Sequence, residues 1–174
     1  MAKKQLKGES SDPVYDPTNS FGYLLRISFR SFSRAIERRT LKHGISSGQW
    51  RFLRVLWMED ELTQKELSRR VGMREPTTVT AVKSLARAGL VTQRKSEEDK
   101  RRIHICLTPR ARKLRDKLLP YVVEVNDLGL KGVTPAQAAL VRQVLLKIVE
   151  NLSTDDGNSY RNADLHVSEL TDDI

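Results

Sequence analysis

The sequence predicts a mainly α-helical protein in which a winged helix-turn-helix, an α-helical unit with a small β-hairpin as its wing, is flanked by long dimerisation helices. Three observations predict this fold class. Two short amphipathic segments are joined by a tight turn that contains Gly72, as in a helix-turn-helix. Directly after them the hydrophobic period changes from helical to two, which indicates a hairpin. Longer stripes with helical periodicity precede and follow this unit.

The first flanking helix is predicted from Ser20 to about His43, with Gly44 as its C-terminal stop. Its apolar positions form two neighbouring stripes: Leu24, Ile27, Ser31 and Ala35 beside Leu25, Phe29, Phe32 and Ile36. A basic stripe recurs every four residues on the same helix: Arg26, Arg30, Arg34 and Arg38. Residues 1–19 contain many Gly, Pro, Ser and Asp and no periodicity, so we expect a flexible arm there.

The helices of the helix-turn-helix are predicted from their ends. Ser46 with Gln49, and Thr63 with Glu66, have the spacing of capping boxes that begin two helices. The next helix has Pro76 at its first position. Gly89 stops it, and its expected apolar side consists of Val79, Val82, Leu85 and Ala86.

The hairpin is predicted from "LVTQRK" and "RIHICLT", which alternate with a period of two around the charged tip "SEEDKR". Ile103, Ile105 and Leu107 should share one face, with His104 and Cys106 on the other. After the hairpin, Thr108 and Pro109 begin a long helix that Pro120 should kink.

"TPAQ" caps a last helix with the apolar stripe Leu140, Val144, Leu145, Ile148 and Leu152. The fold therefore occupies residues 20–152, with the DNA-binding part at about 47–108 and the dimerisation part at about 20–45 and 109–152. Residues 153–174 are polar and acidic, and we expect them to be disordered.

The distribution of charge points to a polyanionic partner. The 174-residue chain carries a net charge of +9. From Leu62 to Leu118 there are sixteen Lys or Arg against six Asp or Glu, a net +10, whereas residues 153–174 carry −5. A basic middle is typical of a surface that binds nucleic acid, although a solvated basic face gives the same count.

Other functions find little support in the composition. The single cysteine, Cys106, and three scattered histidines form no zinc or catalytic set, so we expect no metal, no cofactor and no enzymatic activity. No segment approaches the ~20 apolar residues that span a bilayer. The polar start of the chain has no apolar signal core, and we expect a cytoplasmic protein that does not bind a membrane.

The helix that begins at Pro76 would be the recognition helix. Its side away from Val79 and Val82 carries small and polar residues that suit close approach to base edges: Pro76, Thr77, Thr80, Ala81 and Ser84. The basic residues beside this face would bind DNA phosphates: Arg74, Lys83 and Arg87. Because no long side chain lies at the centre of this face, DNA shape should carry part of the specificity.

A hairpin that follows a recognition helix would reach the neighbouring minor groove, whose negative potential attracts an arginine. We assign that role to Arg101 and phosphate contacts to Lys100 and Arg102. Asp99 would repel DNA, so we expect it to hold the Arg101 guanidinium through a bidentate pair.

From about Gly22 to Leu152 the chain resembles the MarR family of bacterial transcriptional regulators. "GISSGQW", "LTQKELSRRVGMREPTTVTAVKSLARAGLV" and "EEDKRRIHICLT" are similar to the family's second helix, its helix-turn-helix and its wing. The resemblance implies a homodimer that binds a pseudo-palindromic operator and is released by a small, often aromatic acid. The implied dimer residues are Phe21, Leu24, Leu140, Val144, Ile148 and Leu152, and the implied effector-binding residues are Arg26, Arg30, Trp50 and Arg54.

Two positions depart from the family pattern. Thr80 stands where members often have Arg, so an operator sequence cannot be carried over. The first helix lacks the cysteine of the peroxide-sensing branch, and Cys106 fits a packed thiol better than a sensor.

The sequence leaves three alternatives to a ligand-released repressor. The protein could be an activator or a regulator without a ligand, because operator position decides between repression and activation. A winged-helix module that binds protein or RNA is a third alternative, which the basic helix and Arg101 disfavour.

Overall fold

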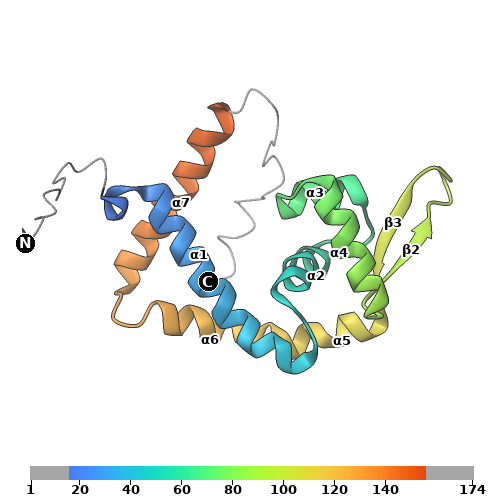
Figure 1. Ribbon diagram of the computed structural model, residues 1–174, viewed down its shortest axis with the longest axis horizontal. Helices are drawn as coiled ribbons and strands as arrows, with labels where there is room; N and C mark the ends of the chain where they lie inside the picture. Colours follow the sequence, from blue (N-terminus) through green and yellow to red (C-terminus); the bar gives the residue numbers. More distant parts are fainter. Residues whose placement is uncertain (1–15, 156–174) are drawn as a thin grey trace, which may run out of the picture.

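The computed structural model describes residues 16–155, and its elements follow the predicted order (Figure 1). The helices preceding the wing are α1 (Phe21–Thr40), α2 (Ser47–Met58), α3 (Gln64–Val71) and α4 (Glu75–Arg87), with short 3-10 turns at Pro17–Asn19 and Leu41–His43. The strands are β1 (Leu62–Thr63), β2 (Val91–Lys95) and β3 (Ile103–Leu107). The helices following the wing are α5 (Pro109–Leu118), α6 (Pro120–Gly129) and α7 (Pro135–Asp155). The predicted class, mainly helical with a small antiparallel sheet, is confirmed.

The predicted helix ends are present. The Ser46 and Thr63 side chains cap α2 and α3, and Gln49 and Glu66 complete both capping boxes. Hydrogen bonds from Thr63 lower the pKa of Glu66, since they stabilise its carboxylate. Gly44 and Gly72 end their helices with φ of 75° and 69°, a left-handed conformation that glycine adopts without strain.

The apolar side of α4 differs from the prediction. Thr78, Val82 and Leu85 are buried, whereas Val79 is half-buried and Ala86 is exposed. Thr78 satisfies its hydroxyl by donating to the Arg74 carbonyl at 3.4 Å, so its methyl group can join the core. Thr78, Val82 and Leu85 have the i, i+4, i+7 spacing of one helix face, and the valine at 79 lies off it.

The wing contains a strand that the sequence did not predict. β1 pairs with β3, which gives a three-stranded antiparallel sheet in the order β1-β3-β2. The predicted alternation on β3 holds only in part, because Ile103 is 44% exposed while Ile105, Cys106 and Leu107 are all buried. The far end of β3 is therefore covered on both faces, and burial raises the pKa of the Cys106 thiol.

The core lies between the helix-turn-helix, the base of the sheet and α5. Leu53, Leu67 and Leu85 are fully buried there. The Trp57 indole donates to the Ala111 carbonyl at 3.0 Å, which joins α2 to α5. This packing fixes α4 and the wing as one unit, so the surface they present is preorganised.

Pro120 separates two helices, α5 and α6, as the predicted kink requires. α6 lies against α1, where Arg39 pairs with Glu124 at 2.7 Å and the His43 ring lies 3.1 Å from the Tyr121 hydroxyl. α1 therefore contacts both α6 and α2.

Gly129 lets the Phe32 ring lie directly against the end of α6. A Cβ at this position would be 2.6 Å from Phe32 Cζ, which is closer than atoms can pack. We expect Gly129→Ala to lower the free energy of unfolding by about 0.5–1.5 kcal/mol, the cost of pushing the partly exposed Phe32 ring off its preferred rotamer. Thermal unfolding checks this, with Gly22→Ala as the control because its Cβ would meet only Ser20 Oγ at 4.0 Å. An unchanged melting temperature for Gly129→Ala would contradict the assigned contact.

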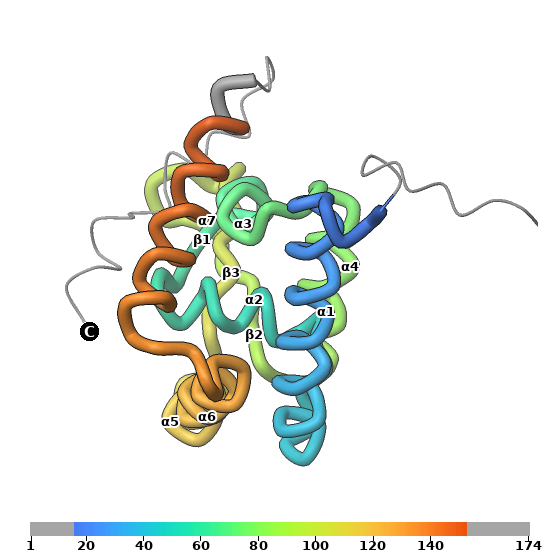
Figure 2. The backbone as a smooth tube through the Cα atoms, turned by 90° about the vertical axis from the view of Figure 1, so that its left-hand side faces the viewer, coloured from blue at the N-terminus to red at the C-terminus, as the bar shows by residue number. Residues whose placement is uncertain are grey.

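α7 begins at a capping box between Thr134 and Gln137 and then projects from the body. It crosses α1 in Figure 1, but Figure 2 places the two helices on opposite sides of the molecule. Leu140 and Leu152 are 60% and 61% exposed, so its predicted apolar stripe is uncovered in the single chain. None of the described helices is long and apolar enough to cross a membrane.

Parts of two predicted segments lie outside the described residues. Of the arm at 1–19, only residues 16–19 are described, and they contain the short turn Pro17–Asn19. Of the tail at 153–174, residues 153–155 continue α7 and the others are not described.

Candidate DNA interface

The predicted recognition face is assembled on α4. Pro76, Thr77 and Thr80 are exposed, and Ala81 and Ser84 are half-buried beside them. The Thr80 hydroxyl donates to the Pro76 carbonyl at 3.2 Å, so it keeps lone pairs free to accept a hydrogen bond. The face combines short polar groups with methyl groups, which matches the donors, acceptors and thymine methyl of a major groove.

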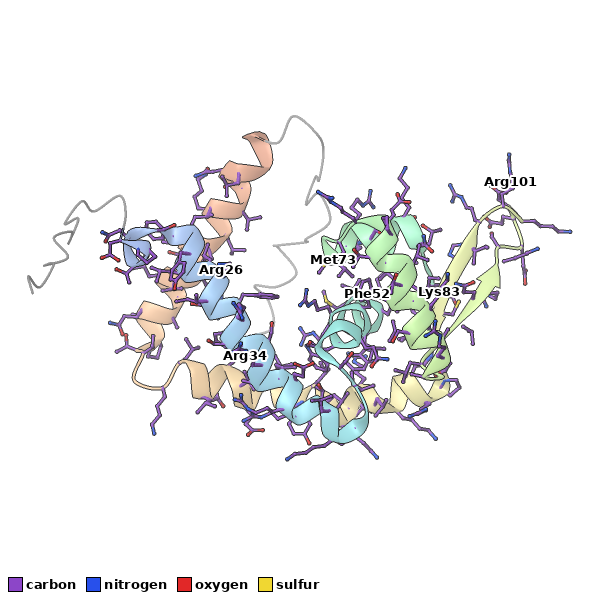
Figure 3. All side chains as sticks on the ribbon, viewed as in Figure 1. Arg26, Arg34, Phe52, Met73, Lys83 and Arg101 are labelled. Carbon is purple, nitrogen blue, oxygen red and sulfur yellow. The ribbon has the colours of Figure 1, made fainter. Side chains whose placement is uncertain are left out.

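This face lines one wall of a groove of about 580 Å³, and the first turn of α2 lines the other. Phe52 and Met73 contribute apolar surface to it (Figure 3). The sequence predicted effector-binding residues on α2, but it did not predict that the start of this helix lies beside the recognition face. No local pattern could have revealed it, because α2 and α4 approach each other only in the folded chain.

Three basic side chains flank the recognition face as predicted. Arg74, Lys83 and Arg87 are all exposed, and in the part of the chain that the structure describes none of them has an ion-pair partner. Figure 3 shows Lys83 on α4 beside the strands of the wing. Their charges are therefore available to phosphates.

The tip of the wing presents Arg101. Its side chain is 93% exposed and points away from the body (Figure 3). The tip is closed by backbone hydrogen bonds from Arg102 to Asp99 at 2.8 Å and from Ser96 to Arg102 at 2.9 Å. Lys100 and Arg102 are exposed on either side.

The predicted bidentate pair between Asp99 and Arg101 is wrong in its geometry. One oxygen, Asp99 Oδ1, accepts from the Arg101 backbone N–H at 3.0 Å and from Nε at 3.3 Å. Because Asp99 and Arg101 are only two positions apart, the backbone N–H of Arg101 reaches the same carboxylate oxygen as Nε, and the two terminal guanidinium nitrogens make no paired contact with Asp99. Asp99 thus shapes the turn and steers the Arg101 side chain, while the terminal nitrogens of Arg101 remain open to DNA.

Two acids that the sequence analysis did not single out fix the base of the wing. Asp60 Oδ1 accepts from the Leu107 N–H at 2.8 Å, and Asp60 Oδ2 pairs with Arg112 at 2.7 Å. Glu61 pairs with Arg94 at 2.5 Å and has a φ of 61°, which is unusual for a residue with a side chain. These contacts join the segment between α2 and β1 to β2, β3 and α5.

The residues implied to bind an effector lie on two helices, α1 and α2. On α2, the Arg54 guanidinium lies 5.9 Å from the centre of the Trp50 ring, and burial lowers the pKa of Arg54. On α1, Arg26 lies over the Tyr23 ring at 5.0 Å and Arg30 is exposed. Within residues 16–155 no hydrogen bond or ion pair joins the two helices at these side chains.

The predicted dimer residues form uncovered apolar surface. Phe21 is 71% exposed, Leu24 is 38% and Val144 is 43%, while Ile148 is half-buried. α6 adds Val123 and Leu128, which the sequence analysis did not include. Among the described residues, no cluster of His, Cys, Asp and Glu could hold a metal ion.

Comparison with known proteins identifies the family. Residues 43–102 match the model of the MarR family. An uncharacterized HTH-type transcriptional regulator of Staphylococcus aureus is 34% identical over 71% of this chain and 90% of its own length. A MarR transcriptional regulator of Methanosarcina mazei Go1 has a similar structure, with a TM-score of 0.70 and 26% identity over 75% of this chain and 94% of that one.

The chain belongs to the MarR family. It is therefore a DNA-binding transcriptional regulator and not an enzyme.

Two further MarR-fold structures were solved with bound molecules. A MarR-family regulator of Listeria monocytogenes, complexed with 26-mer DNA, has a TM-score of 0.72 and 19% identity over 86% of this chain and 95% of its own. CouR of Rhodococcus jostii RHA1, bound to p-coumaroyl-CoA, has a TM-score of 0.67 and 21% identity over 77% of this chain and 94% of its own. At identities of 19% and 21%, these two likenesses show a shared fold and nothing more.

Proposed function

We propose that this MarR-family protein is a homodimeric repressor that binds a pseudo-palindromic operator and is released by a small acidic, aromatic effector. The observation that carries the DNA-binding part is the uncovered recognition face of α4 beside the exposed Arg101 of the wing. α4 would lie in the major groove and Arg101 in the adjacent minor groove. The complex of the Listeria regulator with DNA supports this use of the fold.

The apolar surface of α1, α6 and α7 supports the homodimer. α7 has no helix or strand of the described chain packed closely on it, and its leucines and valines are exposed except Leu146, which is half-buried. A soluble protein seldom leaves so long an apolar stripe in water, and a second copy of the same surface would cover it. Two-fold symmetry would then place the two half-sites about one helical turn apart.

Arg54 supports the effector. It is a half-buried cation beside an aromatic ring, and in the described chain it has no acidic partner. A carboxylate or phosphate of a bound ligand would supply the missing charge, and Trp50 would contact an aromatic ring. CouR, which was solved with p-coumaroyl-CoA, supports a ligand of this type.

We expect Arg54→Ala to raise the concentration of aromatic acid needed to release DNA by about 10- to 100-fold, the worth of a charged hydrogen bond. A panel of hydroxylated benzoic and cinnamic acids, added to the labelled complex, measures this. Arg38→Ala is the control, since it removes an exposed arginine outside the proposed site. If the same concentration of acid released DNA from the wild type and from Arg54→Ala, Arg54 would not belong to the effector site.

Selection of binding sites from a pool of random duplexes tests the proposed function. We expect an inverted repeat with half-sites about one helical turn apart. A single unrepeated site would contradict the homodimer, and failure to enrich any duplex would favour the protein- or RNA-binding alternative. A reporter gene placed behind the selected operator then distinguishes repression from activation.

A further inference from the structure

The Gln49 side chain caps its own helix, α2, and also bonds to a second helix, α4. Its position at the start of α2 explains only the first of these contacts. As the third residue of that helix it completes the capping box: its Oε1 accepts from the Ser46 N–H at 3.1 Å, and its own N–H donates to Ser46 Oγ at 3.3 Å. Its remaining amide group, Nε2, donates to Ser84 Oγ of α4 at 3.1 Å. Ser84 belongs to the recognition face, so this bond holds the face against α2.

Comparison with the other capping boxes shows that the second contact is not part of capping. On α3, Glu66 uses one oxygen for both contacts with Thr63. On α7, Gln137 accepts from Thr134 through Oε1. Of these three capping residues in the described chain, Gln49 is the one whose side chain also bonds to another helix.

The same end of α2 is attached to α1. Glu37 of α1 accepts from the Ser47 N–H at 3.0 Å, and this hydrogen bond lowers the pKa of Glu37. The connecting loop is closed by Thr40, whose buried hydroxyl donates to the Ile45 carbonyl at 2.9 Å. The first turn of α2 is thus fixed to α1 on one side and to α4 on the other.

We propose that Gln49 is a positioning residue that sets the place of the recognition helix relative to α1, and through it the half-site spacing that the dimer accepts. The path runs from Glu37 through the backbone of Ser47 and the side chain of Gln49 to Ser84; we name it the α1–α4 linkage. This inference rests on the proposed function, because α1 lies in the proposed dimer surface and α4 in the proposed DNA surface. Within each protomer the linkage holds these two surfaces at a fixed separation.

The preference for half-site spacing tests the linkage. The duplexes are the selected operator and two versions with one base pair added or removed between the half-sites. Each change shifts one half-site relative to the other by about 3.4 Å along the duplex and rotates it by about 35°. The wild type should prefer the original spacing by at least about fivefold, comparable with one wrong base pair. Gln49→Ala should reduce that preference toward equal binding, by at least about twofold, the lower limit of the worth of one hydrogen bond.

Ser46→Ala is the matched control. It removes the hydroxyl that caps the same helix end and that also donates to Gln49 Oε1 at 3.4 Å. It leaves two bonds of the Gln49 side chain in place, from the Ser46 N–H to Oε1 and from Nε2 to Ser84 Oγ. Both alanine variants should lower the melting temperature, because both weaken the start of α2. Only Gln49→Ala should relax the spacing preference, so a loss that merely followed stability would appear in both variants.

Ser84→Ala provides a second variant that leaves the α2 cap intact. It removes the acceptor of the same bond, so it should relax the spacing preference as Gln49→Ala does, and the double variant should go no further. Unchanged spacing preference in Gln49→Ala, or additive losses in the double variant, would overturn the inference. A wild type that enriches no operator would instead overturn the proposed function, and the two failures are therefore distinct.

Discussion

Arg101→Ala is expected to weaken binding to the operator by about 1–3 kcal/mol, or roughly 5- to 150-fold, without unfolding the protein. The side chain is 93% exposed and, within residues 16–155, makes one ion pair, with Asp99, so its removal costs the free protein little. In the complex the guanidinium would lie in a narrow minor groove, where its charge is worth most. Fluorescence anisotropy with labelled operator measures the loss, and thermal unfolding verifies the fold.

Two further variants serve as controls for Arg101→Ala. Arg115→Ala removes the same charge from the exposed face of α5, away from the tip of the wing in Figure 1, and should change affinity little. Asp99→Ala leaves Arg101 in place but removes the oxygen that holds its Nε and backbone N–H, so a smaller loss is expected. If Arg101→Ala bound the operator as tightly as the wild type, the wing would have no role in the groove.

Replacing both Leu140 and Val144 with Glu is expected to convert the dimer to a monomer and to lower operator affinity by about a thousandfold or more. Their side chains are 60% and 43% exposed on one face of α7, and two charges there would have to be buried in the dimer. Glu is a good helix former, so α7 itself should persist. A monomer contacts only one half-site, so its affinity for the operator falls most of the way to that for non-specific DNA.

Sedimentation equilibrium measures the first part of this expectation. The wild type should have twice the 19.9 kDa mass of the chain, and the double variant should have the mass of one chain. Gln143→Glu is the control, because it adds a charge at an exposed polar position of α7 outside the apolar stripe. A wild type that sediments as a monomer would contradict the dimer directly.

The helix boundaries could be predicted because their causes are local. Capping boxes at Ser46 and Thr63, the stop at Gly72 and the break at Pro120 each depend on residues a few positions apart. The recognition face and the wing tip follow from helical and hairpin periodicity in the same way. These elements account for most of the fold and for the choice of candidate DNA contacts.

The features that were missed depend on contacts between distant residues. β1 has two residues and exists because it pairs with β3, 41 to 43 positions further along the chain, so no local pattern indicates it. Thr78 is buried in place of Val79 because the direction of α4 is set by the core and not by hydrophobicity alone. The bond between Gln49 and Ser84 spans 35 positions, and its capping role hid the second contact.

The central claim is that this chain recognises a particular duplex through α4 and the wing. Anisotropy titrations across a range of salt concentrations test it most directly, with the selected operator and a scrambled duplex of the same length and composition. The account predicts a preference of about 10³ or more for the operator, with affinity that falls steeply as salt rises. Equal and weak binding to both duplexes at every salt concentration would contradict it.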